Sequence, residues 1–170
     1  MGFAVRSEQQ HPQWASRRVR RRPRQAALSR AATRAAERAF QTFVRASSDA
    51  RLERTAGSTR GLPLVFGVMA RAYDPSRAPG FRGELECDLR RADGRRTPWT
   101  LTLDGERATA RPGPARAPAL TLRLTVADFQ RLAAGELDAG RALLTGRLDL
   151  AGDFSLAQRL GEMFGRPAAL

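Results

Sequence analysis

The sequence predicts an α+β fold in which about five mainly antiparallel strands form a twisted sheet, covered on one face by helices. The middle of the chain alternates apolar and polar residues with the period of a strand, and the segments on either side repeat apolar residues with the helical period. Glycine, proline and aspartate separate these segments. Residues 61–170 are long enough for one domain with its own core. We therefore expect one domain preceded by an extension.

The extension, residues 1–60, holds most of the excess positive charge. It carries 14 arginines against four acidic residues, whereas residues 61–170 carry 16 arginines against 13 acidic residues. Residues 1–25 lack a hydrophobic period and are predicted to be a flexible basic tail. Residues 26–46 show the pattern of a basic amphipathic helix whose apolar face is mostly alanine. Residues 47–60, which include Gly57-Ser58-Thr59, are predicted to be a linker.

A basic arm on a nearly balanced domain indicates an anionic partner, either a membrane leaflet or a nucleic acid. A solvated tail without a partner is the alternative. Nucleic acid is disfavoured because the arm does not interleave aromatic residues with its arginines, as stacking surfaces do. The arginines expected at a membrane surface are Arg17, Arg18, Arg20, Arg21, Arg22, Arg24, Arg30, Arg34 and Arg38.

The domain is predicted to begin with a helix from Leu62 to Tyr73, in which Pro63 occupies the first turn and Asp74-Pro75 ends the helix. Its apolar residues lie all round, so neighbouring elements must cover most of its sides. A hairpin with one apolar face follows, turning at Asp93-Gly94. The inward residues of the hairpin are Leu85, Cys87, Leu89, Trp99, Leu101 and Leu103.

Two more strands are expected near Ala108 to Arg111 and around Leu120, Leu122 and Leu124. The helical period returns after Val126, with Gly135 as a C-cap, and a short helix or turn spans Asp138 to Leu144. The chain then forms a last strand between Gly146 and Gly152 and a final helix that Ser155 opens. The final helix has one apolar face, which consists of Leu156, Leu160, Met163 and Phe164.

Three segments of the C-terminal third carry a family resemblance: Leu120 to Phe129, Leu132 to Asp138, and Ala142 to Ala157. Together with the spacing of Gly135, Gly146 and Gly152, they resemble the sterol carrier protein 2 lipid-transfer domains, including short stand-alone bacterial members. Weaker similarity extends upstream to about Leu62. The resemblance implies a hydrophobic tunnel between sheet and helices, and it implies binding of fatty acids, acyl-CoAs, phospholipids or sterols without a fixed catalytic set.

Residues that line such a tunnel follow from matching positions and from the apolar sheet face, although each could equally be ordinary core. The resemblance implies Phe129, Leu132, Leu144, Leu148, Leu150, Leu156, Leu160 and Met163. The sheet face and the flanking helices add Phe66, Met69, Leu85, Cys87, Trp99, Leu101, Leu103, Leu122, Leu124 and Phe164. Tyr73 and Trp99 are candidates to hydrogen-bond the polar end of a ligand.

The sequence shows no catalytic or metal-binding pattern. The single histidine, His11, lies in the tail, and the single cysteine, Cys87, alternates with Glu86 and Asp88 on a strand, so we expect it to be a buried, unreactive thiol. We expect no catalytic residue, metal or cofactor. The first hypothesis is a cytoplasmic, non-enzymatic carrier of a fatty acyl, sterol or isoprenoid-like molecule. The alternative is an enzyme that uses the pocket as a template for isomerisation or cyclisation of an apolar metabolite, with Glu86 or Asp149 as its acid. A third hypothesis is a nucleic-acid-binding or scaffold protein that acts through the arginine-rich arm.

Overall fold

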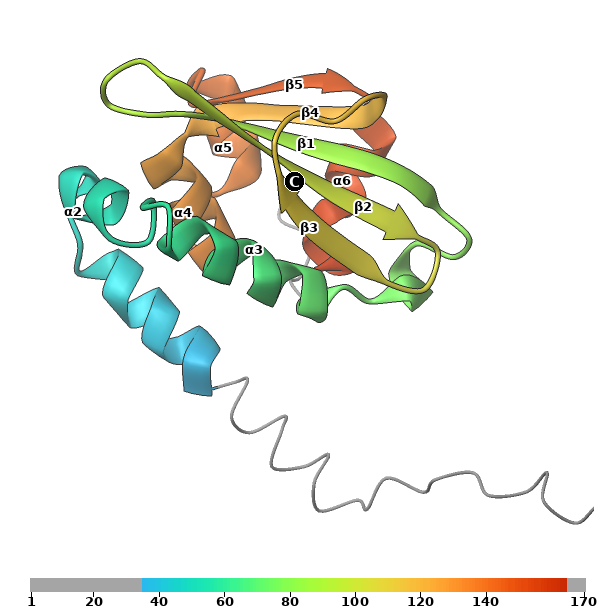
Figure 1. Ribbon diagram of the computed structural model, residues 1–170, viewed down its shortest axis with the longest axis horizontal. Helices are drawn as coiled ribbons and strands as arrows, with labels where there is room; N and C mark the ends of the chain where they lie inside the picture. Colours follow the sequence, from blue (N-terminus) through green and yellow to red (C-terminus); the bar gives the residue numbers. More distant parts are fainter. Residues whose placement is uncertain (1–34, 165–170) are drawn as a thin grey trace, which may run out of the picture. The chain divides into compact units, whose positions relative to one another are not determined.

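The computed structural model describes residues 35–164, whose five strands form one twisted sheet (Figure 1). The strand order is β3-β2-β1-β4-β5. The strands are β1 (Arg82–Arg90), β2 (Arg96–Asp104), β3 (Ala108–Pro112), β4 (Pro118–Thr125) and β5 (Leu148–Gly152). Pairs β1–β2, β2–β3 and β4–β5 are antiparallel, and β1–β4 is parallel. The mainly antiparallel α+β sheet predicted from the sequence is confirmed.

The helices of the domain gather on one side of this sheet (Figure 1). They are α3 (Gly61–Ala72), the 3₁₀ turn η1 (Pro75–Arg77), α4 (Val126–Ala134), α5 (Ala139–Leu144) and α6 (Phe154–Met163). Helix α3 packs on β3, whereas α4, α5 and α6 pack on the side of β4 and β5. Helix α4 also contacts β1, the central strand, so helices lie over both edges and over part of the centre of the sheet.

The predicted turn residues end the elements as expected. Gly135, the C-cap of α4, has a φ of 74°, and its N–H donates to the carbonyl groups of Arg131 and Leu132. Gly152 ends β5 with a φ of 106°, and a Cβ there would lie 2.3 Å from the Ala119 carbonyl oxygen. Both positions require glycine, because other residues rarely adopt this left-handed backbone and a side chain at Gly152 would collide with β4.

The polar face of the sheet lies opposite the helices, and the connection between β3 and β4 crosses it. Strands β3 and β4 are separated by β2 and β1, so residues 113–117 must pass over both. The N–H groups of Ala115 and Arg116 donate to Glu86 and Glu84 at 2.7 and 2.8 Å. Glu84 and Glu86 of β1 therefore hold the crossing segment against the polar face of the sheet.

Residues 47–60 differ from the predicted linker. They contain α2 (Asp49–Arg54), which Ser48 caps by accepting a hydrogen bond from the N–H of Arg51. Residues 35–45 are also helical, and Val44 and Leu52 are fully buried against Ala127 and Ala134 of α4. The linker prediction was wrong because six residues are too few to show a helical period in the sequence. The helix is stabilised by the burial of Leu52, which the sequence pattern does not show.

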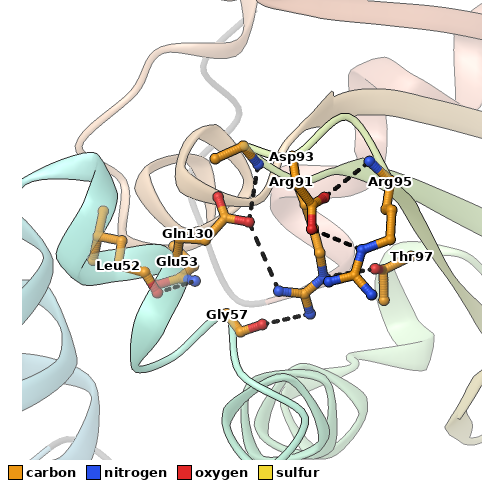
Figure 2. Close-up of polar contacts among 9 residues, drawn as sticks. Leu52, Glu53, Gly57, Arg91, Asp93, Arg95, Thr97 and Gln130 are labelled. Atoms are coloured by element: carbon orange, nitrogen blue, oxygen red, sulfur yellow. Dashed lines mark hydrogen bonds and ion pairs between the residues drawn. The ribbon is translucent and has the colours of Figure 1, made fainter.

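A polar network fixes α2 to the hairpin turn (Figure 2). The guanidinium of Arg91 lies 3.7 Å from the carboxylate of Glu53 and donates to the Gly57 carbonyl at 2.8 Å and to the Thr97 hydroxyl at 2.9 Å. On α4, the side-chain amide of Gln130 donates to the Leu52 carbonyl at 3.3 Å. Glu53 and Arg91 are both mostly buried, so this ion pair is shielded from salt more than a surface pair.

Candidate ligand-binding interior

The apolar residues of the strands meet in rows on the face that the helices cover. Because strand side chains alternate between faces, register partners on neighbouring strands lie side by side. The rows are Leu101–Leu85–Leu120, Trp99–Cys87–Leu122–Leu150 and Leu89–Leu124–Leu148. Together they make a continuous apolar floor, mostly leucine, that reaches from β2 to β5.

Three stacked aromatic rings stand between this floor and the helices. Phe66 of α3 lies between Trp99 of β2 and Phe129 of α4, with ring centroids 4.5 Å and 4.8 Å apart and interplanar angles of 4° and 17°. Phe66 is fully buried. The stack joins α3, which packs on the edge strand β3, to α4, which packs on β1 and β4, and Phe66 fills the space between them.

The other end of the interior is closed by the junction of α3 and α6. The N–H of Asp74, just after α3, donates to the carbonyl of Met163 at 2.7 Å. Nearby, the rings of Tyr73 and Phe164 have centroids 5.8 Å apart. Met163 is fully buried and belongs to the same apolar cluster as the sheet rows. The last turn of α6 is thus fixed to the end of α3 by one backbone hydrogen bond and one ring contact.

Seventeen of the eighteen positions expected to line a pocket lie in this one apolar cluster or pack against it. The buried ones are Phe66, Leu85, Cys87, Trp99, Leu101, Leu103, Leu122, Leu124, Phe129, Leu148, Leu156 and Met163. The partly buried ones are Met69, Leu132, Leu150, Leu160 and Phe164. Residues that line a pocket and residues that form a solid core would both lie together in this way. Their role as pocket lining therefore stays a prediction.

Leu144 does not lie in the interior. It is the last residue of α5 and its side chain is 91% exposed, so the expectation that it lines a pocket was wrong. The residues of α5 that belong to the cluster or pack against it are Ala139, Ala142 and Leu143. In a six-residue helix the inward face depends on how the helix rests on β5, which the sequence pattern does not specify.

The interior also contains residues that were not among the expected lining. They are Leu62, Tyr73, Ala78, Leu89, Leu120, Val126, Ala142 and Ala157. Strand alternation already identified Leu89 and Leu120 as inward, and Tyr73 follows Met69 at helical spacing. No pattern in the sequence marks Ala78 or Ala157, because alanine is common on exposed helix faces as well.

The residues considered for chemistry lie where solvated or inert groups are expected. Cys87 is buried, and its burial together with the charge of Glu86 raises the pKa of the thiol to about 12. Glu86 accepts its hydrogen bond from Ala115 on the polar face, and Asp149 pairs with Arg123 at 3.1 Å on the same face. Both carboxylates proposed for the enzyme alternative therefore face away from the apolar interior.

The basic arm lies almost entirely outside the described residues, as does His11. Arg17, Arg18, Arg20, Arg21, Arg22, Arg24, Arg30 and Arg34 fall in this part, and Arg38 is exposed on the helix at residues 35–45. Between residues 35 and 164 the protein has no helix that is both long and apolar enough to span a bilayer. The same stretch has no group of three or more metal-ligating side chains.

The model of the SCP-2 sterol transfer family matches residues 70–165. The chain belongs to this family. The match covers the sheet, η1 and helices α4 to α6, with only the end of α3. It therefore confirms the resemblance drawn from the glycine spacing of the C-terminal third.

Solved structures support the SCP-2 fold. A part of the stereoselective inverting sec-alkylsulfatase Pisa1 from Pseudomonas sp. is 27% identical with a TM-score of 0.52. That alignment covers 65% of this chain and only 17% of the sulfatase, so the chain corresponds to a small part of that enzyme. Palmitated sterol-carrier-like protein SCP2L2 from Aedes aegypti is 23% identical with a TM-score of 0.50, over 62% of this chain and 95% of that one. Among curated proteins, no sequence matches this chain significantly.

Proposed function

We propose that the SCP-2 domain of this protein is a non-enzymatic carrier that holds the alkyl chain of a lipid or similar small molecule between its sheet and its helices. One observation carries the proposal: a single apolar cluster contains buried residues from β1, β2, β4 and β5 and from α3, α4, α5 and α6, and two alanines of β3 pack against it. Membership of a sterol transfer family supports the same class of ligand. The likeness to part of an enzyme named for alkyl sulfates agrees with an alkyl-chain ligand.

The ligand takes the space that Phe66 now fills. Phe66 stacks between Trp99 and Phe129 and is the α3 residue at the centre of the interior, so movement of α3 away from the sheet opens the apolar floor. Burial of the alkyl chain against leucine side chains then replaces the aromatic contacts that the movement breaks.

Displacement of a fluorescent long-chain probe from the full-length protein tests this function. Each buried methylene contributes about 0.8 kcal/mol, so the affinity of a homologous series should rise about fourfold per methylene until the interior is full. A flat series would indicate adsorption to the surface and contradict an internal site. Turnover of the bound compounds would favour the enzyme alternative, which the outward positions of Glu86 and Asp149 disfavour.

We propose further that the basic arm binds the carrier to the anionic, cytoplasmic surface of a membrane. Each arginine near such a surface contributes on the order of 1 kcal/mol, and salt screens the attraction. Replacement of Arg17, Arg18, Arg20, Arg21, Arg22 and Arg24 by serine should abolish cosedimentation with anionic vesicles at low salt. A control variant in which the exposed residues Arg60, Arg71 and Arg107 are replaced by serine should still cosediment with the vesicles. Retention of RNA in place of vesicles would assign the arm to nucleic acid, and retention of neither would make it a solvated tail.

A further inference from the structure

Four buried side-chain oxygens have no hydrogen-bond partner within residues 35–164, namely those of Ser47, Tyr73, Asp88 and Gln130. Asp88 lies on the polar face of the sheet, where its other oxygen meets Arg96. Ser47 precedes α2, and Gln130 reaches α2 through its amide group. Tyr73 alone among the four belongs to the main apolar cluster. Its hydroxyl is thus the unpartnered polar group of the candidate interior.

The hydroxyl of Tyr73 is enclosed by the protein. The residue is 9% exposed, yet its Oη atom is fully enclosed, so the remaining exposure belongs to the ring edge or the backbone. Two contacts hold the phenol in this position: the hydrogen bond from the Asp74 N–H to the Met163 carbonyl and the ring of Phe164 at 5.8 Å.

An enclosed hydroxyl without a partner costs free energy, because folding removes its hydrogen bond to water and returns none. Phenylalanine would fill the same volume without this cost. Satisfied groups are the rule in protein interiors, so an exception at the end of an apolar interior calls for a partner that the described residues do not supply. A ligand whose polar head reaches the α3–α6 junction would provide one.

The charges around Tyr73 select the type of head group. Burial, and then the charges of Asp104 and Asp74, raise the pKa of the phenol, so it stays protonated and can donate a hydrogen bond. Asp74 stays ionised, because hydrogen bonds from Ser76 lower its pKa. Asp74 pairs with Arg77 at 3.9 Å, which offsets part of the repulsion between the two carboxylates and an anionic head group. A fatty-acid carboxylate would also lose its hydration in this enclosed position, with no cation of the described residues in hydrogen-bond contact with the phenol. An uncharged oxygen meets no such repulsion.

We propose that Tyr73 is the residue that selects the head group of the ligand: its Oη donates a hydrogen bond to an uncharged oxygen, of an alcohol, ester or ketone, while the alkyl chain lies along the leucine floor. This inference rests on the proposed carrier function. It assigns a chemical class to the ligand, a neutral amphiphile, and places its polar end at the junction of α3, η1 and α6.

The matched variant is Tyr73→Phe in the full-length protein, which removes only the oxygen. Dodecanol and dodecanoate, which share a chain length, are compared as competitors of a fluorescent probe at a pH where the acid is ionised. We expect the wild type to bind dodecanol more tightly than dodecanoate. The variant should lose roughly three- to tenfold in affinity for dodecanol, the worth of one net hydrogen bond, and should bind dodecanoate unchanged.

Two further measurements separate an anchoring role from a structural one. Tyr73→Phe should leave the melting temperature of the free protein unchanged or raised, because it removes an unsatisfied group, and a structural role for the hydroxyl would lower it. Tyr73 is also the only tyrosine of the chain. Labelling tyrosine with ¹³C at Cζ therefore gives a single NMR signal, which should shift when dodecanol binds and stay in place when dodecanoate binds.

The outcomes distinguish this inference from the carrier function on which it rests. If the wild type binds none of the competitors, the carrier function itself fails. If the wild type and Tyr73→Phe bind dodecanol equally, the domain is a carrier but Tyr73 does not anchor the head. If the wild type prefers dodecanoate, the neutral class is wrong, whatever the variant does.

Discussion

Replacement of Phe66 tests both the core and the proposed site, because this side chain occupies the centre of the interior. Phe66 is fully buried and stacks on Trp99 at 4.5 Å and on Phe129 at 4.8 Å. Removing a buried phenylalanine to alanine typically costs about 3–5 kcal/mol, and each aromatic pair contributes about 0.5–1.5 kcal/mol of interaction beyond burial. We therefore expect Phe66→Ala to lose about 4–5 kcal/mol of unfolding free energy, near the upper end of that range.

Urea denaturation followed by circular dichroism measures this loss. Since small domains are stable by about 5–15 kcal/mol, Phe66→Leu, which keeps most of the volume and loses both stacks, serves as a milder second variant with an expected loss of about 2 kcal/mol. Leu64→Ala on the same helix is the matched control, because Leu64 is 72% exposed and its replacement should change stability by less than about 0.5 kcal/mol.

The same variants test whether the interior is the binding site. Phe66→Ala leaves an apolar space between α3 and the floor of the sheet, so an alkyl ligand should restore more stability to this variant than it adds to the wild type. Equal stabilisation of both proteins would place the ligand elsewhere. A loss below about 1 kcal/mol for Phe66→Ala would refute the aromatic stack itself.

Three further predictions follow from burial at single positions. Met163→Arg should cost several kcal/mol of stability and abolish probe binding, whereas Leu144→Arg, at a position that is 91% exposed, should change neither; a binding defect in Leu144→Arg would return α5 to the site. Leu52→Ala should destabilise the whole domain by about 2–5 kcal/mol in thermal unfolding, since Leu52 is fully buried against α4, while a separate early transition would show that α2 unfolds independently. Cys87, whose pKa is raised to about 12, should resist iodoacetamide at pH 8 in the native protein and react in urea; rapid native alkylation would contradict its burial.

Local patterns in the sequence determined most of the sheet and the helix ends. Alternation placed Leu85, Cys87 and Leu101 on one face, because strand side chains point to opposite sides in turn. Gly135 and Gly152 marked ends of elements, since their positive φ angles exclude most other residues. Each of these inferences uses only neighbouring residues, and for that reason each could be drawn before any contact was known.

Contacts between distant segments decided the rest. The helix of residues 49–54 exists because Leu52 packs on α4 and Glu53 meets Arg91, and neither partner is visible from a linker-like composition. Leu144 shares its apolar character with its neighbours but points to solvent, because the orientation of α5 is set by β5. The unpartnered hydroxyl of Tyr73 is likewise a property of the fold: it depends on what α6 places beside the end of α3, some 90 residues later in the chain.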